Sequence, residues 1–202
     1  MTSAPLIGVL AIQGAVREHV QLLEAAGAEA VQIRHASDLD RVSGIVLPGG
    51  ESTTISKLAV IDGLMDPLRE AARSDVPMYG SCAGMILLAD RILDGRPDQQ
   101  TIGGIDMTVR RNAFGRQVDS FEGGISLQGF EGAAFPGIFI RAPWVEEIGP
   151  GVEVLGRVES GAAEGRIVAV RDGNLIATSF HPELTGDTRV HQYFVEMVRR
   201  AA

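Results

Sequence analysis

The chain has 202 residues, of which 45% are hydrophobic and 25 are glycine, and its formal net charge is −8. This length and composition predict one domain over residues 1–202, with a sizeable core and many tight turns. The negative charge argues against binding to nucleic acid or to an anionic membrane surface. A single cysteine excludes an internal disulfide and a multi-cysteine metal site, and we expect no metal and no cofactor.

No apolar stretch approaches the length of a membrane span, and no basic leader precedes the apolar run over residues 6–12. We therefore expect a cytoplasmic protein. Among the 18 basic residues there is one lysine, Lys57, which lies in a Ser/Thr-rich helix start where we expect it to face solvent. Schiff-base chemistry needs a lysine in an apolar or cationic pocket, so the chain is a poor candidate for carbonyl chemistry of its own.

The first half of the chain alternates predicted strands and helices. Apolar runs over residues 6–12, 30–33, 44–47 and 76–79 are typical of parallel strands buried on both faces. Helices are expected over 16–26, from a cap at Ser52 or Thr53, over 67–73 and over 83–89. This order predicts an α/β fold of three layers, flavodoxin-like, with a mostly parallel or mixed sheet flanked by helices.

The second half changes character. Short strands are expected over 105–110, 125–127, 138–140, 152–155, 167–170 and 175–180, and a closing helix over 189–200. We interpret these strands as a mixed extension of the sheet. The polar segment 94–101 contains glycine and proline, which favours a mobile loop.

Cys82 is the residue that most strongly indicates chemistry. It lies in Gly-Ser-Cys-Ala-Gly (80–84), a small-residue turn between a predicted strand and a predicted helix. Such a turn exposes a nucleophile at the edge of a sheet, and the start of a helix favours a thiolate. The alternative is that Cys82 is a small buried apolar residue.

A thiol nucleophile needs a base and a group that orients the base. Pro182 biases His181 toward extended backbone, so His181 and Glu183 should project to the same side from the end of the last strand. Cys82 follows a strand at the same edge of the sheet, which predicts a Cys82–His181–Glu183 triad. Alone, His-Pro-Glu would be an ordinary loop. We expect the other three histidines, His19, His35 and His191, to be surface residues or satisfied polar residues.

The turn Pro-Gly-Gly-Glu-Ser (48–52) lies at the same edge. Its glycines let backbone N–H groups approach a ligand, so the N–H of Gly50, with that of Ala83, is a candidate oxyanion hole for acyl transfer. A plain turn is the alternative, and no phosphate-binding lysine motif is present.

Several strings together resemble a known family. The segments 80–84, 48–50 and 181–183 look like those of the class I, triad-type glutamine amidotransferases. Longer strings resemble, within that class, the glutaminase subunits of pyridoxal 5′-phosphate synthase complexes. These are LAIQGAVREH (10–19), PGGESTT (48–54), RNAFGRQVDSF (111–121), FIRAP (139–143) and SFHPELT (179–185).

The resemblance implies that Cys82 forms a glutamyl thioester with L-glutamine, releases ammonia and is regenerated by water. It implies glutamine-binding positions at Gly49, Gly50, Glu51, Arg111, Ile140 and Arg141. An arginine can hold a carboxylate with two hydrogen bonds and Glu51 can meet an ammonium group, although an internal ion pair is the alternative for each arginine.

A partner is also implied, because the chain has no acceptor domain for ammonia. By the resemblance, this partner is a barrel-shaped synthase subunit in a large hetero-oligomer, which makes pyridoxal 5′-phosphate from ribose 5-phosphate, glyceraldehyde 3-phosphate and ammonia. Three alternatives stay open: a glutaminase that serves another pathway, such as histidine or aminobenzoate synthesis; a thiol peptidase or esterase; and a non-catalytic binding module.

Overall fold

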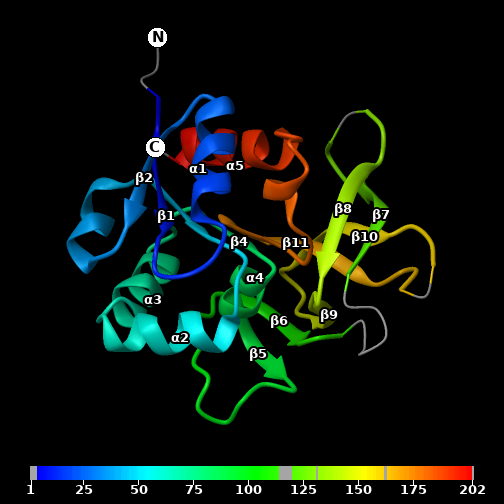
Figure 1. Ribbon diagram of the computed structural model, residues 1–202, viewed down its shortest axis with the longest axis horizontal. Coiled ribbons are helices and arrows are strands. Elements are labelled where there is room, and N and C mark those ends of the chain that lie inside the picture. The colour runs from blue at the N-terminus through cyan, green and yellow to red at the C-terminus, as the bar shows by residue number, and fades with distance from the viewer. Residues whose placement is uncertain (1–3, 114–119, 131, 162, 202) are drawn as a thin grey trace.

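The computed structural model describes residues 4–113, 120–130, 132–161 and 163–201. Within them, five α-helices and twelve strands form an α/β fold (Figure 1). The helices are α1 (Val16–Ala25), α2 (Ser52–Ile61), α3 (Met65–Arg73), α4 (Ala83–Leu88) and α5 (Arg189–Ala201). Two 3₁₀ helices are η1 (Ala36–Arg41) and η2 (Pro182–Leu184).

The first four strands and β12 form a parallel half-sheet in the order β2-β1-β3-β4-β12. These strands are β1 (Leu6–Leu10), β2 (Glu29–Ile33), β3 (Gly44–Leu47), β4 (Met78–Ser81) and β12 (Leu175–Thr178). Strands β1, β3, β4 and β12 are almost entirely buried, as their apolar runs predict.

An antiparallel extension continues from β12 in the order β11-β10-β7-β8. It consists of β7 (Ser120–Leu127), β8 (Phe135–Ile140), β10 (Glu153–Val158) and β11 (Ile167–Asp172). Three further strands lie off this path: β5 (Ala89–Leu93), β6 (Ile105–Arg110) and β9 (Trp144–Ile148). The mixed sheet confirms the fold class expected from the sequence.

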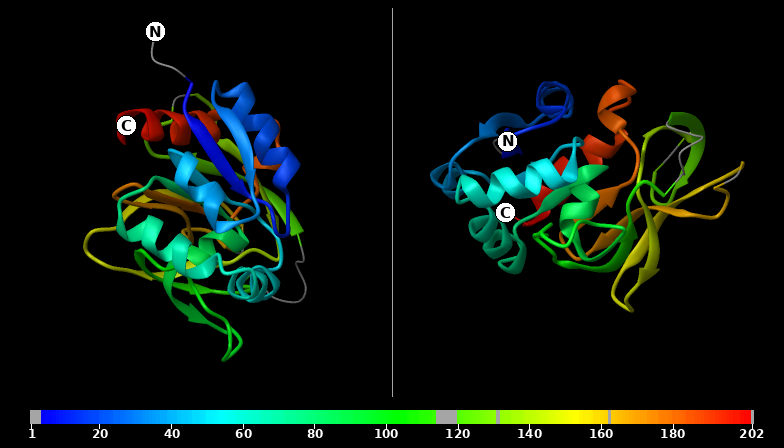
Figure 2. Two further views of the ribbon diagram at one scale, coloured as in Figure 1. Left: turned by 90° about the vertical axis from the view of Figure 1, so that its left-hand side faces the viewer. Right: turned by 60° about the horizontal axis from the view of Figure 1, so that its bottom comes forward.

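Helices cover both faces of the sheet. Helices α1 and α5 lie together on one face, and α2 and α3 lie on the other (Figures 1 and 2). The side chains of β4 show how the two cores are divided: Met78 packs into the core under α2, α3 and α4, and Tyr79 packs into the core under α1 and α5. None of the helices in the described ranges is both long and apolar enough to cross a membrane.

Two local predictions were wrong. Helix α2 is capped by Glu51, whose carboxylate accepts the N–H of Thr54, rather than by Ser52 or Thr53. Strand β4 runs to Ser81, two residues further than its apolar run, because the glycine and serine of the turn still pair with β12. Strands β5 and β9 were not predicted, since their half-exposed sequences lack a clear alternation.

Candidate active site

The parallel pairing of β4 with β12 brings Cys82 and His181 to the same edge of the sheet. Ser81, the last residue of β4, lies opposite Thr178, the last residue of β12. The backbone N–H of Cys82 donates to the carbonyl oxygen of Thr178 at 2.7 Å, which joins the two strand ends where the chain turns. Cys82 and His181 therefore lie at the same edge of the sheet, as the sequence predicts.

Cys82 occupies a strained turn. Its backbone has φ 48° and ψ −98°, a conformation that residues other than glycine rarely adopt. Helix α4 begins at the next residue. The turn is possible because its flanking residues are small: a Cβ at Gly80 would lie 2.4 Å from the carbonyl carbon of Gly84, and one at Gly84 would lie 2.2 Å from the carbonyl oxygen of Leu47. This is the geometry of a nucleophile elbow.

His181 and Glu183 form a tight buried pair. The imidazole Nδ1 lies 2.7 Å from Oε1 of Glu183, and both side chains are almost fully buried. The backbone is not the extended segment expected, because Pro182 starts the 3₁₀ helix η2, a position that its fixed φ favours. The two side chains converge across one 3₁₀ turn instead.

The charges around His181 favour its protonated form. Burial alone would lower the pKa of His181, but the hydrogen bonds and charges of Cys82 and Glu183 raise it to about 10. Burial would likewise raise the pKa of Glu183, but the attraction of His19 and the hydrogen bond of His181 lower it below its ordinary value. An imidazolium held by a carboxylate next to a thiol is the arrangement that activates a thiolate nucleophile.

Cys82 opens into a cavity of about 430 Å³. The cavity collects most of the residues predicted from the sequence: its lining is Gln13, Gly50, Glu51, Ser52, Cys82, Ala83, Ile86, Arg111, Asn112, Ile140, Arg141 and His181. Gly49 and Glu183 are the exceptions, and both are buried. A Cβ at Gly49 would lie 2.5 Å from Cε1 of His181, and Glu183 contacts Nδ1 of the same ring.

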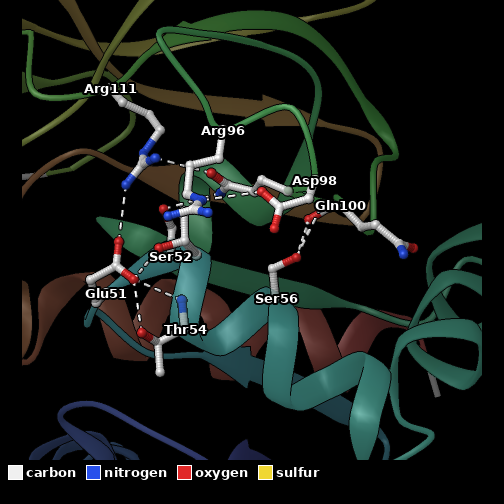
Figure 3. A network of polar contacts seen from close by, with 10 residues as sticks. Glu51, Ser52, Thr54, Ser56, Arg96, Asp98, Gln100 and Arg111 are labelled. Carbon is white, nitrogen blue, oxygen red and sulfur yellow. Dashed lines mark hydrogen bonds and ion pairs between the residues drawn. The ribbon is translucent and has the colours of Figure 1, made fainter.

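Arg111 and Glu51 form the internal ion pair that was the alternative to ligand binding. Nη2 of Arg111 lies 3.0 Å from Oε1 of Glu51 (Figure 3). The other oxygen of Glu51 accepts hydrogen bonds from the hydroxyls of Thr53 and Thr54. Burial alone would raise the pKa of Glu51, but these hydrogen bonds lower it to about 2. Both partners also line the cavity, which therefore carries charges of both signs.

The segment 94–101 is tied to this charged pair. Gln99 accepts a hydrogen bond from Arg111 at 3.1 Å and donates one to Ser52 at 3.1 Å. The next residue, Gln100, exchanges backbone hydrogen bonds with the hydroxyl of Ser56. No sequence pattern indicates these contacts, because a glutamine in a polar loop looks like any other solvated side chain.

The glycine turn of the candidate oxyanion hole is held by the loop before α1. The backbone N–H of Glu51 donates to Oε1 of Gln13 at 2.8 Å, and that of Ala15 donates to the carbonyl oxygen of Gly49 at 3.2 Å. Gly14 has φ 110°, and a Cβ there would lie 1.9 Å from that oxygen, so only glycine fits. Gln13 thus lines the cavity and holds the glycine turn. In the sequence it stands out only as part of the string 10–19 that resembles the family.

The remaining histidines divide into two groups. His35 is exposed, as expected. His19 and His191 are not at the surface: both are 0% exposed and contact each other, which fits the expected alternative of polar residues with partners. His19 also contacts Ser81 and Glu183. Two facing helices, α1 and α5, bury both histidines.

The fold is that of a glutamine amidotransferase, as a solved structure shows. A crystal structure of a glutamine amidotransferase matches with a TM-score of 0.87 at 44% identity, covering 96% of this chain and 98% of that one. A putative GMP synthase component from Thermoplasma acidophilum shares the fold, with a TM-score of 0.67 at 16% identity over 99% of this chain and 96% of that one.

The chain belongs to the SNO glutamine amidotransferase family, whose model matches residues 9–200. Curated relatives agree. A protein of Salinispora arenicola is 62% identical over 98% of this chain and 99% of its own length, and one of Kineococcus radiotolerans is 64% identical over 98% of each. Both are named pyridoxal 5′-phosphate synthase subunit PdxT. The family expected from the sequence is confirmed, although residues 114–119 of the string 111–121 lie outside the described residues.

Proposed function

We propose that this chain is the glutaminase subunit of a pyridoxal 5′-phosphate synthase. A single glutaminase domain over residues 1–202 hydrolyses L-glutamine to L-glutamate and ammonia in the cytoplasm. It delivers the ammonia to a barrel-shaped synthase subunit within a large hetero-oligomer. The observation that carries the proposal is that Cys82 and His181 line a cavity with charges of both signs, while Glu183 holds the His181 ring from behind.

The chemistry follows from the positions of the groups. The Cys82 thiolate attacks the side-chain amide carbon of glutamine, and the oxyanion that forms is held by the backbone N–H groups of Gly50 and Ala83. The C–N bond then breaks, and the protonated His181 gives its proton to the leaving ammonia. Glu183 holds the His181 ring in the tautomer and orientation that this step needs.

The second half of the reaction returns the enzyme to its starting state. Water loses a proton to neutral His181 and attacks the thioester carbon, which releases glutamate and the Cys82 thiolate. The charged groups lining the cavity orient the substrate: Glu51 meets its α-ammonium group, and Arg111 or Arg141 binds its α-carboxylate. Gly50 and Ile140 line the cavity, and Gly49 lies beside it against His181.

The test is glutamate release from glutamine by the full chain, with and without the synthase subunit. We compare wild type with Cys82→Ala and use His35→Ala, a change at an exposed histidine, as a control. Cys82→Ala should lose glutamate release and His35→Ala should keep it. A Cys82→Ala variant as active as wild type would remove the proposal.

A second measurement separates the proposal from a peptidase or an esterase. Cys82 is the chain's one cysteine, so its alkylation by iodoacetamide can be followed without interference. Saturating glutamine should protect Cys82 from alkylation. If the chain cleaves model peptides without a partner, and if glutamine does not protect Cys82 from alkylation, the chain would be a thiol hydrolase of another kind.

A further inference from the structure

A buried polar cluster lies behind the carboxylate of Glu183. It consists of His19 from α1, Ser81 from the end of β4 and His191 from α5, each of them 0% exposed. The three side chains come from elements at the two ends and the middle of the chain. They are not among the residues that line the cavity, so they cannot touch the substrate there.

The contacts form a chain that ends on Glu183. Nδ1 of His19 lies 2.9 Å from Nε2 of His191, and Nε2 of His19 lies 3.1 Å from Oγ of Ser81. Nε2 of His19 also lies 3.5 Å from Oε2 of Glu183, and the Ser81 hydroxyl donates to Oε1 of Glu183 at 3.4 Å. The ring of Tyr79 packs edge-on against both imidazoles, with centroids 5.9 Å and 5.8 Å away.

Burial acts against the charged form of both imidazoles, so we argue from neutral rings that each carry one N–H. Burial lowers the pKa of His19 below its ordinary value even though the charge of Glu183 opposes this. Burial, together with the neighbouring His19, lowers the pKa of His191 to about 3. Two directions of the hydrogen-bond chain are then possible, and they differ in which ring donates to the other.

The unpartnered atoms decide the direction. Over the described ranges, the buried side-chain atoms without a hydrogen-bond partner are Nδ1 of His191 and Oε2 of Glu183. If His19 donated to His191, the N–H of His191 Nδ1 would be orphaned, and a lone pair of His19 would face the Glu183 carboxylate. If His191 donates to His19, the orphan is a lone pair, and the N–H of His19 points at Ser81 and Glu183. An orphaned buried N–H is the rarer and costlier state, so the second direction holds.

Three side chains therefore direct a donor toward one carboxylate. Oε1 of Glu183 receives the N–H of His181 and the hydroxyl of Ser81, and Oε2 faces the N–H of His19. We propose that His19, oriented by His191 and assisted by Ser81, is a positioning residue that fixes the Glu183 carboxylate against His181. This inference rests on the proposed function, because only in that function does Glu183 orient His181 for catalysis.

A positioning role predicts a particular kinetic signature. Without the His19 donor, a carboxylate in this buried place must turn toward another partner or bind a proton, and His181 then loses its fixed orientation. Because the three cluster residues lie outside the cavity, the loss should appear in kcat while KM stays unchanged.

The sharpest test compares two amide substitutions, His19→Gln and His19→Asn. Glutamine can place an N–H near the position of Nε2, next to Glu183, whereas asparagine reaches only the position of Nδ1, next to His191. We measure glutaminase kcat and KM of the full chain with its synthase subunit, per alkylatable Cys82. His19→Gln should stay within about fivefold of wild type, and His19→Asn should lose about 10- to 100-fold in kcat, as expected when a buried carboxylate loses a polar contact.

Two controls separate positioning from stability. Leu23→Ala alters a 0% exposed residue one turn further along α1, in the same core, and should lower the melting temperature without lowering kcat per folded chain. Ser81→Ala deletes a single hydroxyl and should lower kcat severalfold, which decides the question if the His19 variants do not fold.

The outcomes are distinguishable. Equal kcat for His19→Gln and His19→Asn, a loss confined to KM, or an equal kcat loss in Leu23→Ala overturns the inference, as does an unchanged kcat in Ser81→Ala. If the wild-type chain releases no glutamate even with its synthase subunit, the proposed function is wrong, and the result does not bear on His19.

Discussion

Gly49 offers the most direct test of the triad geometry. A Cβ at this position would lie 2.5 Å from Cε1 and 2.8 Å from Nδ1 of His181, and 3.3 Å from Oε1 of Glu183. Ordinary contacts begin at 3.4 Å, so in Gly49→Ala the ring must retreat by about 0.9 Å or the glycine turn must move by as much. The substitution therefore separates His181 from Cys82 or from Glu183.

The expected cost can be divided between activity and stability. A displacement of about 1 Å in a catalytic group lowers the rate by roughly 100-fold. The overpacking itself costs about 1–3 kcal/mol of the free energy of unfolding, so the chain should still fold. We therefore expect kcat to fall by about two orders of magnitude, with KM for glutamine little changed.

The assay is steady-state glutamate release with the synthase subunit, together with a thermal melt of each variant. Gly151→Ala is the matched control, because its nearest neighbour would be Oδ1 of Asp172 at 3.7 Å. It should behave as wild type. If Gly49→Ala kept kcat within threefold of wild type, the close packing of this turn against His181 would have no part in the chemistry.

Three further outcomes are expected. Gln99→Ala removes an acceptor that, with Glu51, orients the Arg111 guanidinium. In steady-state kinetics, KM for glutamine should rise about fivefold, which corresponds to about 1 kcal/mol of binding free energy, with kcat unchanged. A change in kcat alone would contradict this prediction. The pKa of Glu51 is lowered from 4.5 to about 2, so its ionised form stabilises the folded chain. In urea unfolding, the free energy of unfolding of wild type should exceed that of Glu51→Gln by a constant amount above pH 4.5, and this difference should disappear as the pH falls toward 2. A difference that persists at pH 2 would contradict the prediction. Cys82→Ala should lower the pKa of His181 from about 10 in an NMR titration, since the partner that raises it is lost, and an unchanged pKa would refute the pairing.

The sequence predicted the site where chain order and strand direction were enough. Parallel strands bring their carboxyl ends to one edge, so Cys82 after one strand and His181 after another had to meet. The same reasoning failed for the backbone of His181–Glu183. Pro182 is equally compatible with an extended segment and with the first turn of a 3₁₀ helix, and the packing of η2 decides between them.

Other features depended on contacts that no local pattern encodes. Glutamate is an unusual helix cap, and Glu51 caps α2 while its other oxygen pairs with Arg111, 60 residues away. His19 and His191 lie 172 residues apart, and the sequence left open whether they are surface residues or polar residues with partners. Their burial follows from the facing of α1 and α5, which only the folded chain shows.

The position of Ser81 links the two halves of the site. Ser81 and Cys82 are consecutive, yet the serine side chain points into the core under α1 and α5 while the cysteine lines the cavity. One strand end thus supplies both the nucleophile and a hydrogen bond to the carboxylate that orients its base. Since His191 lies on the last helix of the chain, the direction of that hydrogen-bond chain is set only when α5 has packed against α1. The geometry of the triad therefore depends on the two ends of the chain as much as on the turn that carries Cys82.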